Sequence, residues 1–433
     1  MGRTELKRRA FAYIDSIRET IIRHGKTVEG MPELGYREQR TSAYVKQEME
    51  RLSLADVRNV AYTGVASALR PRAGGENVCL IGELDAVLTP DCPYADPATG
   101  AAHTCGHNIQ IAQLLGCADA IKNSGIAREL DGNVTFLAVP AEEFVDLDYR
   151  RKLKEEGRIQ KLSGKQELIA SGFFRDVSCA MMVHSQPNCP EAACFIDCRS
   201  LGFVAKKIRF IGKAAHAGGA PYEGINALNA AMAAIMCIHA MRETFRDEDK
   251  IRVHPIITHG GDLVNIVPAD VTMETYVRGA TPSAVEDACA KVDRAIRGAA
   301  YAVGAQVEIT DVGGYAPLQQ NRQLGALFEE NAKLFLDGNR IYHGVDMVGS
   351  TDMGDLSLEL PAIQPTFGGY CGGAHSAEFR SVDDEITHIL PVKILTATVI
   401  DLLADRAQNA CRIREEFVQS PSEAEQPQSR LAF

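Results

Sequence analysis

The chain has 433 residues and a mass of 47.0 kDa, which is long for one domain and favours two or three packed units. Its 46 Lys and Arg against 57 Asp and Glu give a formal net charge of −11, which argues against a nucleic-acid-binding protein, whose surface is normally basic. Hydrophobic residues make up 45% and charged residues 24%, a balance that excludes wholesale disorder.

The sequence predicts a cytoplasmic protein with no membrane attachment. No uninterrupted apolar run reaches the ~18 residues that a membrane helix needs, and the N-terminal segment lacks the apolar core of a secretory signal. The 12 cysteines follow no repeated spacing and form no CxxC pair. We therefore expect reduced thiols, most of them small buried hydrophobes.

The first half of the chain predicts helices that alternate with strands. Apolar residues at three- and four-residue spacing predict helices over residues 11–29 and 37–52, and a third helix over 106–125. Short apolar runs predict strands at 64–71, 77–87, 133–144 and 180–185. A charged stretch, 148–169, is interpreted as a solvent-exposed helix and loop.

This alternation is typical of an α/β fold with a mostly parallel sheet and flanking helices. Ligands in such sheets bind beyond the carboxyl ends of the strands. Several side chains with metal-binding or catalytic chemistry fall at such ends: Glu83, Asp85, Glu142, Glu143 and His184.

The pattern changes over residues 201–315, where the predicted order is strand, helix, strand, strand, helix, strand. This βαββαβ order is that of a ferredoxin-like unit. We therefore predict a catalytic α/β domain, residues 1–200 and 316–418, interrupted by this smaller domain. Residues 419–433 are polar and predict a disordered tail.

Two short segments carry residues suited to a metal site. Cys105 and His107 flank a glycine just before a predicted helix, whose N-terminus favours a thiolate. Glu142 and Glu143 leave a buried strand, so one can bind a metal while the other acts as general base. Each segment alone also has an ordinary structural interpretation. Taken together, the residues with soft and borderline ligand atoms indicate a metal site: Cys105, His107, Glu143, His184 and His375.

The inserted domain adds a histidine and a cation. His216 lies in a predicted loop between strand and helix, and Arg278 ends a predicted strand. On a separate domain, such residues suit a closing lid that clamps an anionic group or polarises a carbonyl. A turn histidine and a surface arginine are the ordinary alternative.

Ten segments occur in an order that resembles one family. They are PELGYREQRTSAYV, GELDAV, HTCGHNIQIAQLLG, VPAEEF, MVHSQP, GKAAHAGGAPYEGINAL, GGDLVNIVPA, YVRG, GSTDMGDLS and AHSAEF. The chain resembles the dimetal amidohydrolase and peptidase family M-twenty, in its aminoacylase-like branch. That branch includes auxin-conjugate, aminobenzoyl-glutamate and N-acyl amino acid hydrolases.

The resemblance implies a role for each matching residue. Cys105 would bridge two divalent metals, with further ligands from His107, Glu143, His184 and His375. Glu142 would be the general base, Asp85 would hold a ligand histidine in place, and His216 would donate to an oxyanion, usually in the partner subunit's active site. Substrate contacts would come from Arg278, Asn265, Ser350 and Thr351. The inserted domain would be both lid and dimerisation surface of a homodimer or higher homo-oligomer.

The implied reaction is hydrolysis of a C–N bond, the amide of an N-acyl or aryl-acyl amino acid, by water that the metal activates. The ligand types suit Mn or Zn, and also Co or Ni. The partner is a small-molecule substrate, with no nucleic acid and no membrane.

The sequence departs from the branch pattern beside the predicted pocket. Asn108 and Gln110 replace the usual acid and histidine, Glu83 replaces a commoner Asp, and a charged insertion near 146–166 replaces a glycine run. These departures keep open a hydrolytic deaminase of an electron-poor aromatic amine, of the 5-nitroanthranilate type.

Two further classes of protein compete with a metal-dependent hydrolase. One is a non-catalytic binding relative, which would require a broken site, whereas every candidate ligand is present. The other is a cysteine-nucleophile hydrolase built on Cys105 and His107, which the surrounding ligands disfavour. Neither a nucleotide-binding glycine motif nor a serine nucleophile elbow occurs in the sequence.

Overall fold

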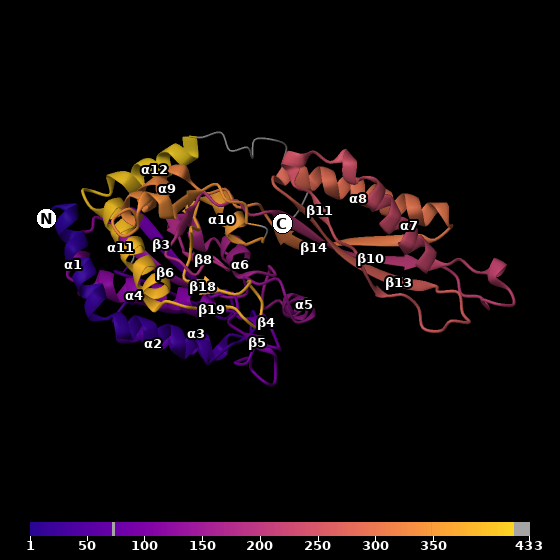
Figure 1. Cartoon of the computed structure of the whole chain (residues 1–433), viewed down its shortest axis with the longest axis horizontal. Helices are drawn as coiled ribbons and strands as arrows, with labels where there is room; N and C mark the ends of the chain where they lie inside the picture. Colours follow the sequence, from indigo (N-terminus) through magenta and orange to yellow (C-terminus); the bar gives the residue numbers. More distant parts are fainter. Residues whose placement is uncertain (72–73, 348, 420–433) are drawn as a thin grey trace. The chain divides into compact units, whose positions relative to one another are not determined.

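The computed structural model describes residues 1–71, 74–347 and 349–419, which form two compact units (Figure 1). Within the described residues, the first unit comprises Met1–Cys198, Gln319–Asp346 and residues 356–419, and the second comprises Arg199–Leu318 and Met347–Asp355. The predicted insertion, 201–315, falls within the second unit. Of the predicted tail, residue 419 ends the last helix, α12 (Gln408–Gln419), and the rest lies outside the described residues.

A six-stranded sheet forms the centre of the first unit. Its strand order is β1-β2-β6-β3-β7-β16, and the last four strands are parallel to one another. The bounds are β1 (Ala55–Val60), β2 (Gly64–Ala68), β6 (Asn133–Val139), β3 (Asn77–Glu83), β7 (Cys179–Met181) and β16 (Ala362–Ile363). The predicted α/β class with a mostly parallel sheet is confirmed.

Helices from both ends of the chain cover this sheet. They are α1 (Arg3–Ser16), α2 (Arg18–Glu29), α3 (Gln39–Arg51), α4 (His107–Asn123), α9 (Arg322–Ala332), α10 (Met353–Glu359) and α11 (Leu390–Leu403). In Figure 1 the indigo N-terminal helices and the yellow α11 lie beside α4. Helix α4 is buried from its first residue to Ile121, including polar residues such as Gln110 and Gln113.

One helical stretch in the described residues, Glu385–Leu403, is long and apolar enough to cross a membrane. It joins a π-helical turn (Glu385–Ile389) to α11. Within the fold, 89% of its most apolar window is buried. Its apolar residues therefore form part of the protein core.

The first unit also contains several short strands outside the central sheet. A four-stranded sheet has the order β15-β9-β17-β8, and two strand pairs, β4–β5 and β18–β19, flank it. Their bounds are β15 (Ile341–His343), β9 (Cys194–Ile196), β17 (Thr366–Phe367), β8 (His184–Ser185), β4 (Val87–Leu88), β5 (Ala101–Ala102), β18 (Tyr370–Cys371) and β19 (Arg380–Ser381).

The charged stretch forms α5 (Leu147–Glu155) and α6 (Gly164–Ala170), but it is exposed only in part. Arg150 and Lys165 are fully buried, contrary to the expectation of a solvated segment. The prediction of a solvent-exposed segment was wrong for these residues, because it was made from charge alone. A buried cation is tolerated where carbonyl and carboxylate oxygens surround it.

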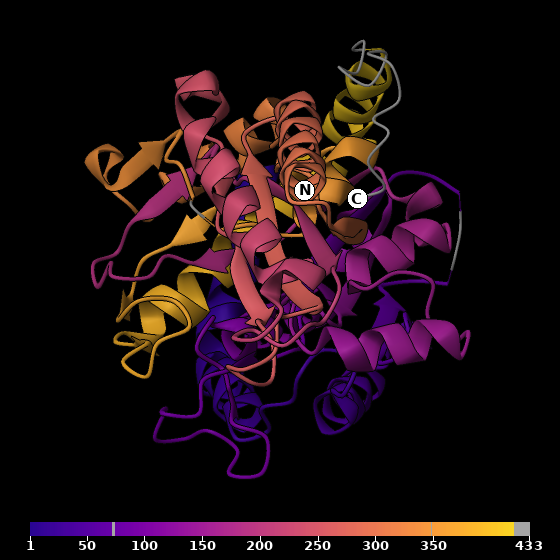
Figure 2. The same cartoon turned by 90° about the vertical axis from the view of Figure 1, so that its right-hand side faces the viewer.

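The second unit is an antiparallel sheet with two helices on it (Figure 2). In chain order its elements are β10 (Gly202–Ile211), α7 (Ala227–Ala240), β11 (Arg252–Val253), β12 (Ile256–His259), β13 (Asp270–Gly279), α8 (Pro282–Ala302) and β14 (Gln306–Tyr315). Strands β13 and β14 flank β10, and β11 and β12 pair with the outer side of β13. Helices α7 and α8 pack side by side on the sheet. The order of elements is the predicted βαββαβ, except that the second strand is divided into β11 and β12.

Candidate metal centre and catalytic site

Cys105 and His107 enter the site at the start of α4. Gly106 between them has φ 90°, a left-handed conformation that glycine adopts at little cost. A Cβ at this position would lie 3.1 Å from the Ser185 Cβ, so the tight packing also favours glycine. The turn places a buried thiol and a buried imidazole, separated by one glycine, at a helix N-terminus.

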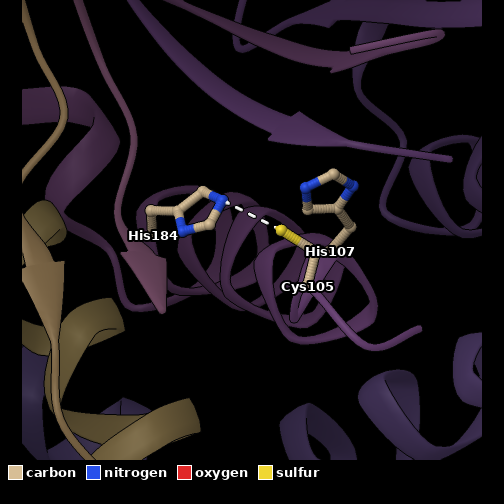
Figure 3. A group of neighbouring side chains, drawn as sticks. All are labelled: Cys105, His107 and His184. Carbon is tan, nitrogen blue, oxygen red and sulfur yellow. Dashed lines mark hydrogen bonds between the residues drawn. The ribbon is translucent and has the colours of Figure 1, made fainter. Parts of the chain in front are cut away.

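The predicted ligands form two groups that share Cys105. One group is Cys105, His107 and His184, and the other is Cys105, Glu143 and His375. Within each group, the potential ligand atoms lie within 4.8 Å of one another. Figure 3 shows the first group, in which Cys105 Sγ lies 3.6 Å from His184 Nε2.

These separations fit shared metal coordination. Two donors bound tetrahedrally to one ion at about 2.0–2.3 Å lie about 3.5 Å apart, close to the distance between Cys105 Sγ and His184 Nε2. In the second group, Glu143 Oε1 and His375 Nε2 are 2.9 Å apart, which is the distance of a direct ion pair and shorter than that spacing. The sharing of one thiolate by both groups suits a bridging ligand between two divalent ions.

Asp85 orients the ring of His107. His107 Nδ1 lies 2.8 Å from the backbone oxygen of Asp85 and 3.4 Å from its Oδ1. The other ring nitrogen, Nε2, is buried and makes no hydrogen bond among the described residues, although the carboxylate oxygen Oε2 of Glu83 lies 3.1 Å away. His107 also groups with Cys105 and His184, so a metal ion bound there would satisfy one of its ring nitrogens. Asp85 Oδ2 also accepts the N–H of Glu143 at 2.9 Å, so Asp85 contacts His107 through its backbone oxygen and Glu143 through its carboxylate.

The electrostatics favour an ionised thiolate. Burial and Glu143 raise the pKa of Cys105, but His107 and His184 outweigh them and lower this pKa to about 6. Hydrogen bonds to Cys105 and Glu143, against the effect of burial, raise the pKa of His375 to about 11. A divalent cation that bound this cluster would displace the protons of its histidines and thiol.

Glu142 faces a different neighbour from Glu143. Its carboxylate groups with Glu83 and His107, with potential ligand atoms within 4.8 Å of one another. The chain here is a turn, since β6 ends at Val139 and Ala141 has φ 55°. The two adjacent carboxylates thus fall in different groups of potential ligands, and the residue before them is not extended.

Sequence reasoning missed a buried ion pair beside this group. Lys165 Nζ lies 2.5 Å from Glu83 Oε1, and Gln110 Nε2 donates to Glu83 Oε2 at 2.9 Å. Glu83 Oε2 in turn lies 3.1 Å from His107 Nε2. Glu83, Gln110 and the charged insertion each depart from the branch pattern, and their joint occurrence was the signal that they interact.

In the second unit, the structure brings His216 and Asn265 together. The loop that contains His216 pairs with residues 265–267, through a bridge between His216 and Ile266 and a hydrogen bond from Ala217 N to Asn265 O at 2.9 Å. The side chain of His216 is not buried, and its Nδ1 accepts the N–H groups of Gly218 and Gly219.

Arg278 and Ser350 also lie together in the second unit. Arg278 Nη1 donates to Ser350 Oγ at 2.6 Å, and its guanidinium lies over the rings of Phe203 and Tyr276. Thr351 is buried, and its Oγ1 accepts the N–H of Met353 at the start of α10. Thr351 therefore has a local structural role, and its contact with substrate stays a prediction.

Residues 79–395 match the model of Peptidase family M20/M25/M40. The chain belongs to this family. Its members are metal-dependent hydrolases of amide or peptide bonds, and this enzyme class holds for the present chain.

Known relatives cover most of the chain. It is 28% identical to the Xaa-Arg dipeptidase of Mus musculus, over 95% of this chain and 94% of the relative. It is 25% identical to one subunit of the p-aminobenzoyl-glutamate hydrolase of Escherichia coli, over 78% of this chain and 77% of the relative. The solved structure of a dinuclear metal-binding peptidase of the family from Bacillus subtilis has a TM-score of 0.69 at 20% identity, covering 90% of this chain and 99% of that one, which shows the same fold.

Proposed function

We propose that this enzyme hydrolyses the amide bond of an N-acyl or aryl-acyl amino acid, dipeptide-like substrates included. The observation that carries the proposal is the pair of ligand groups sharing Cys105, with Glu142 grouped against His107 beside them. The Xaa-Arg dipeptidase and the p-aminobenzoyl-glutamate hydrolase support it, because both names denote substrates with an amide next to an amino acid.

The proposed metals are Mn or Zn, with Co or Ni also suited to a Cys, His and carboxylate set. Bound divalent ions would acidify water and polarise the scissile carbonyl. Cys105, His107 and His184 would hold one ion. Cys105, Glu143 and His375 would hold the other.

The remaining steps belong to side chains of the enzyme. Glu142 takes a proton from the attacking water and passes it to the departing nitrogen. His216 accepts two N–H groups at Nδ1, so its proton sits on Nε2, and we assign that N–H to stabilising the developing oxyanion. Arg278, held by Ser350, would pair with the substrate carboxylate, and Asn265 beside His216 would contact a substrate polar group.

A substrate panel with controlled metal tests this function. Chelated protein should be inactive, and Mn or Zn should restore release of the amino acid from acyl and aryl-acyl amino acids or dipeptides. Glu142→Gln should lower kcat by about 10²- to 10⁴-fold and leave bound metal unchanged.

Three outcomes would contradict the proposal. Release of ammonia from electron-poor anilines, with no amino acid released from any conjugate, would establish the deaminase instead. Full activity of Cys105→Ser after chelation would exclude a role for Cys105 as a metal ligand. A protein that neither binds nor responds to divalent metals would be the non-catalytic relative.

A further inference from the structure

Two buried charged side chains hold the turn that presents Glu142. Ala141, the residue before it, is a non-glycine residue with φ 55°, a conformation that costs about 1 kcal/mol or more and persists only where surrounding contacts enforce it. Contacts of this kind surround Ala141 on both of its peptide groups.

The first contact comes from Glu38, which precedes α3. Its Oε1 accepts the N–H of Ala141 at 2.8 Å, and its Oε2 accepts the hydroxyl of Thr63 at 2.6 Å. Glu38 is fully buried, and burial together with Asp85 raises its pKa to about 7. Burying a carboxyl group is expensive, so its position on this amide requires a reason.

The second contact comes from Arg150 on α5, in the charged insertion. Its Nη1 donates to the carbonyl oxygens of Ala141 at 3.2 Å and Leu162 at 2.8 Å, and its Nη2 donates to that of Glu143 at 2.5 Å. Arg150 therefore holds the carbonyl before Glu142 and the carbonyl of Glu143. The guanidinium geometry allows this, because its N–H groups diverge from one rigid plane.

Gly35 gives independent evidence that the space for Arg150 is built into the fold. A Cβ on Gly35 would collide with Nη2 of Arg150 and would lie 2.8 Å from Cα of Ala141. The φ of Gly35 is not in the left-handed region, so close approach rather than backbone conformation requires glycine here. The ring of Tyr36 lies 5.6 Å from the same guanidinium.

We infer that Arg150 and Glu38 are positioning residues for Glu142. Neither needs to contact the substrate. Together they fix the peptide groups around the general base and its neighbour Glu143, while Asp85 fixes the N–H of Glu143. The inference rests on the proposed role of Glu142, and it gives the charged insertion a function in catalysis.

The main test compares Arg150→Met with Arg151→Met in the full-length, metal-loaded enzyme. Arg151 neighbours Arg150 on α5, but it bonds to Asp148 and to the backbone of Leu147 on its own helix, so it is the matched control. Arg150→Met should lower kcat by about 10- to 100-fold with KM and bound metal little changed, because small misplacements of a catalytic group have effects of that size. Arg151→Met should keep the wild-type kcat.

Leaving-group dependence separates positioning from mere destabilisation. A displaced Glu142 delivers its proton poorly to the departing nitrogen, which matters less for a p-nitroanilide than for an amide of an ordinary amino acid. The loss in Arg150→Met should therefore be several-fold smaller on the p-nitroanilide of the same acyl group. An equal loss on both substrates, or kcat equal to that of Arg151→Met, would overturn the inference.

Glu38 provides a second route if Arg150→Met does not fold. Glu38→Gln keeps an acceptor for the Ala141 N–H and should retain most activity, whereas Glu38→Leu should show the same leaving-group-dependent loss. Equal activity of the Glu38→Gln and Glu38→Leu variants would contradict the inference.

Glu142→Gln distinguishes a failure of the proposed function from a failure of the positioning role. If this variant is fully active, the proposed base is wrong and the positioning role fails with it. If it is inactive while the Arg150 and Glu38 variants are normal, only the positioning role fails.

Discussion

At the scale of single residues, the Lys165–Glu83 pair shows how a buried charge depends on its partner. Both side chains are fully buried, with Nζ and Oε1 2.5 Å apart. Burial raises the pKa of Glu83, but Lys165 and then His107 reverse this effect and lower it to about 2. Removing one member leaves the other charged in a low-dielectric environment, which is costlier than losing the pair.

Lys165→Met should therefore lower the free energy of unfolding by about 3–5 kcal/mol, measured by urea unfolding of the metal-free protein. Adding Glu83→Gln should recover part of this loss, because the isolated carboxylate is then gone. Lys152→Met is the control, since Lys152 is exposed on the same insertion and its 4.0 Å pair with Glu156 contributes little. The account is wrong if Lys165→Met unfolds at the wild-type urea concentration.

Single residues also show which parts of the site could be predicted from the sequence. The candidate ligands could be predicted because each of them lies in a short local motif. Arg150, Lys165 and Glu38 were not readable as site residues, because their partners are 7 to 103 residues away in the chain. No local pattern marks a cation that points inward, and only the packed fold shows where its charge is compensated.

At the scale of elements, helices α2 and α3 meet through a buried polar contact. His24 Nδ1 on α2 lies 2.7 Å from the hydroxyl of Tyr44 on α3. Burial lowers the pKa of His24 to about 4, with Glu48 opposing the shift and Arg23 and Arg51 adding to it. His24 is therefore neutral in the folded protein at neutral pH.

This pair predicts acid sensitivity of the helical layer. The unfolded chain binds a proton at His24 near pH 6.5 and the folded chain only near pH 4, so stability is lost as pH falls through this window. His24→Gln should reduce the decrease in unfolding free energy between pH 7 and pH 4.5 by about 2 kcal/mol, measured by denaturant unfolding at each pH. An unchanged pH dependence in the variant would rule out this contribution.

Element periodicity predicted the long helices and the buried strands, but it missed the shortest elements. Strands such as β8 and β17 are two residues long, and their parallel pairing with each other joins His184 to Thr366, far apart in the chain. A run of two residues has no periodicity, so only the assembled sheet defines it as a strand.

At the scale of the whole molecule, the second unit exposes large apolar side chains. Met232 and Met236 on α7 are 54% and 68% exposed, and Ile256 on β12 and Leu263 after it are 61% and 60% exposed. Strand β12 pairs with β13 alone among the described residues, so its other edge is available for pairing. These features support the expected homodimer through the inserted domain.

Met236→Glu combined with Ile256→Lys should convert a dimer to a monomer, measured by light scattering coupled to size exclusion. Activity should fall with it, since the family resemblance places His216 in the partner subunit's active site. Leu334→Glu in the first unit is the control, because Leu334 is 56% exposed outside this surface. A monomeric wild-type protein, or a dimer that persists in the double variant, would exclude this interface.

The sequence by itself determined the α/β class, the longer helices and strands and the family, and it predicted a set of metal-binding side chains. These properties reside in local patterns: apolar periodicity, glycine at a left-handed turn, and ligands next to strand ends or helix starts. Only the tertiary structure decided that the charged insertion turns Arg150 and Lys165 inward, and that Glu38 holds the Ala141 amide. The physical reason is that a buried charge is stable only where distant oxygens or carboxylates converge on it, and this convergence exists only once the chain is packed.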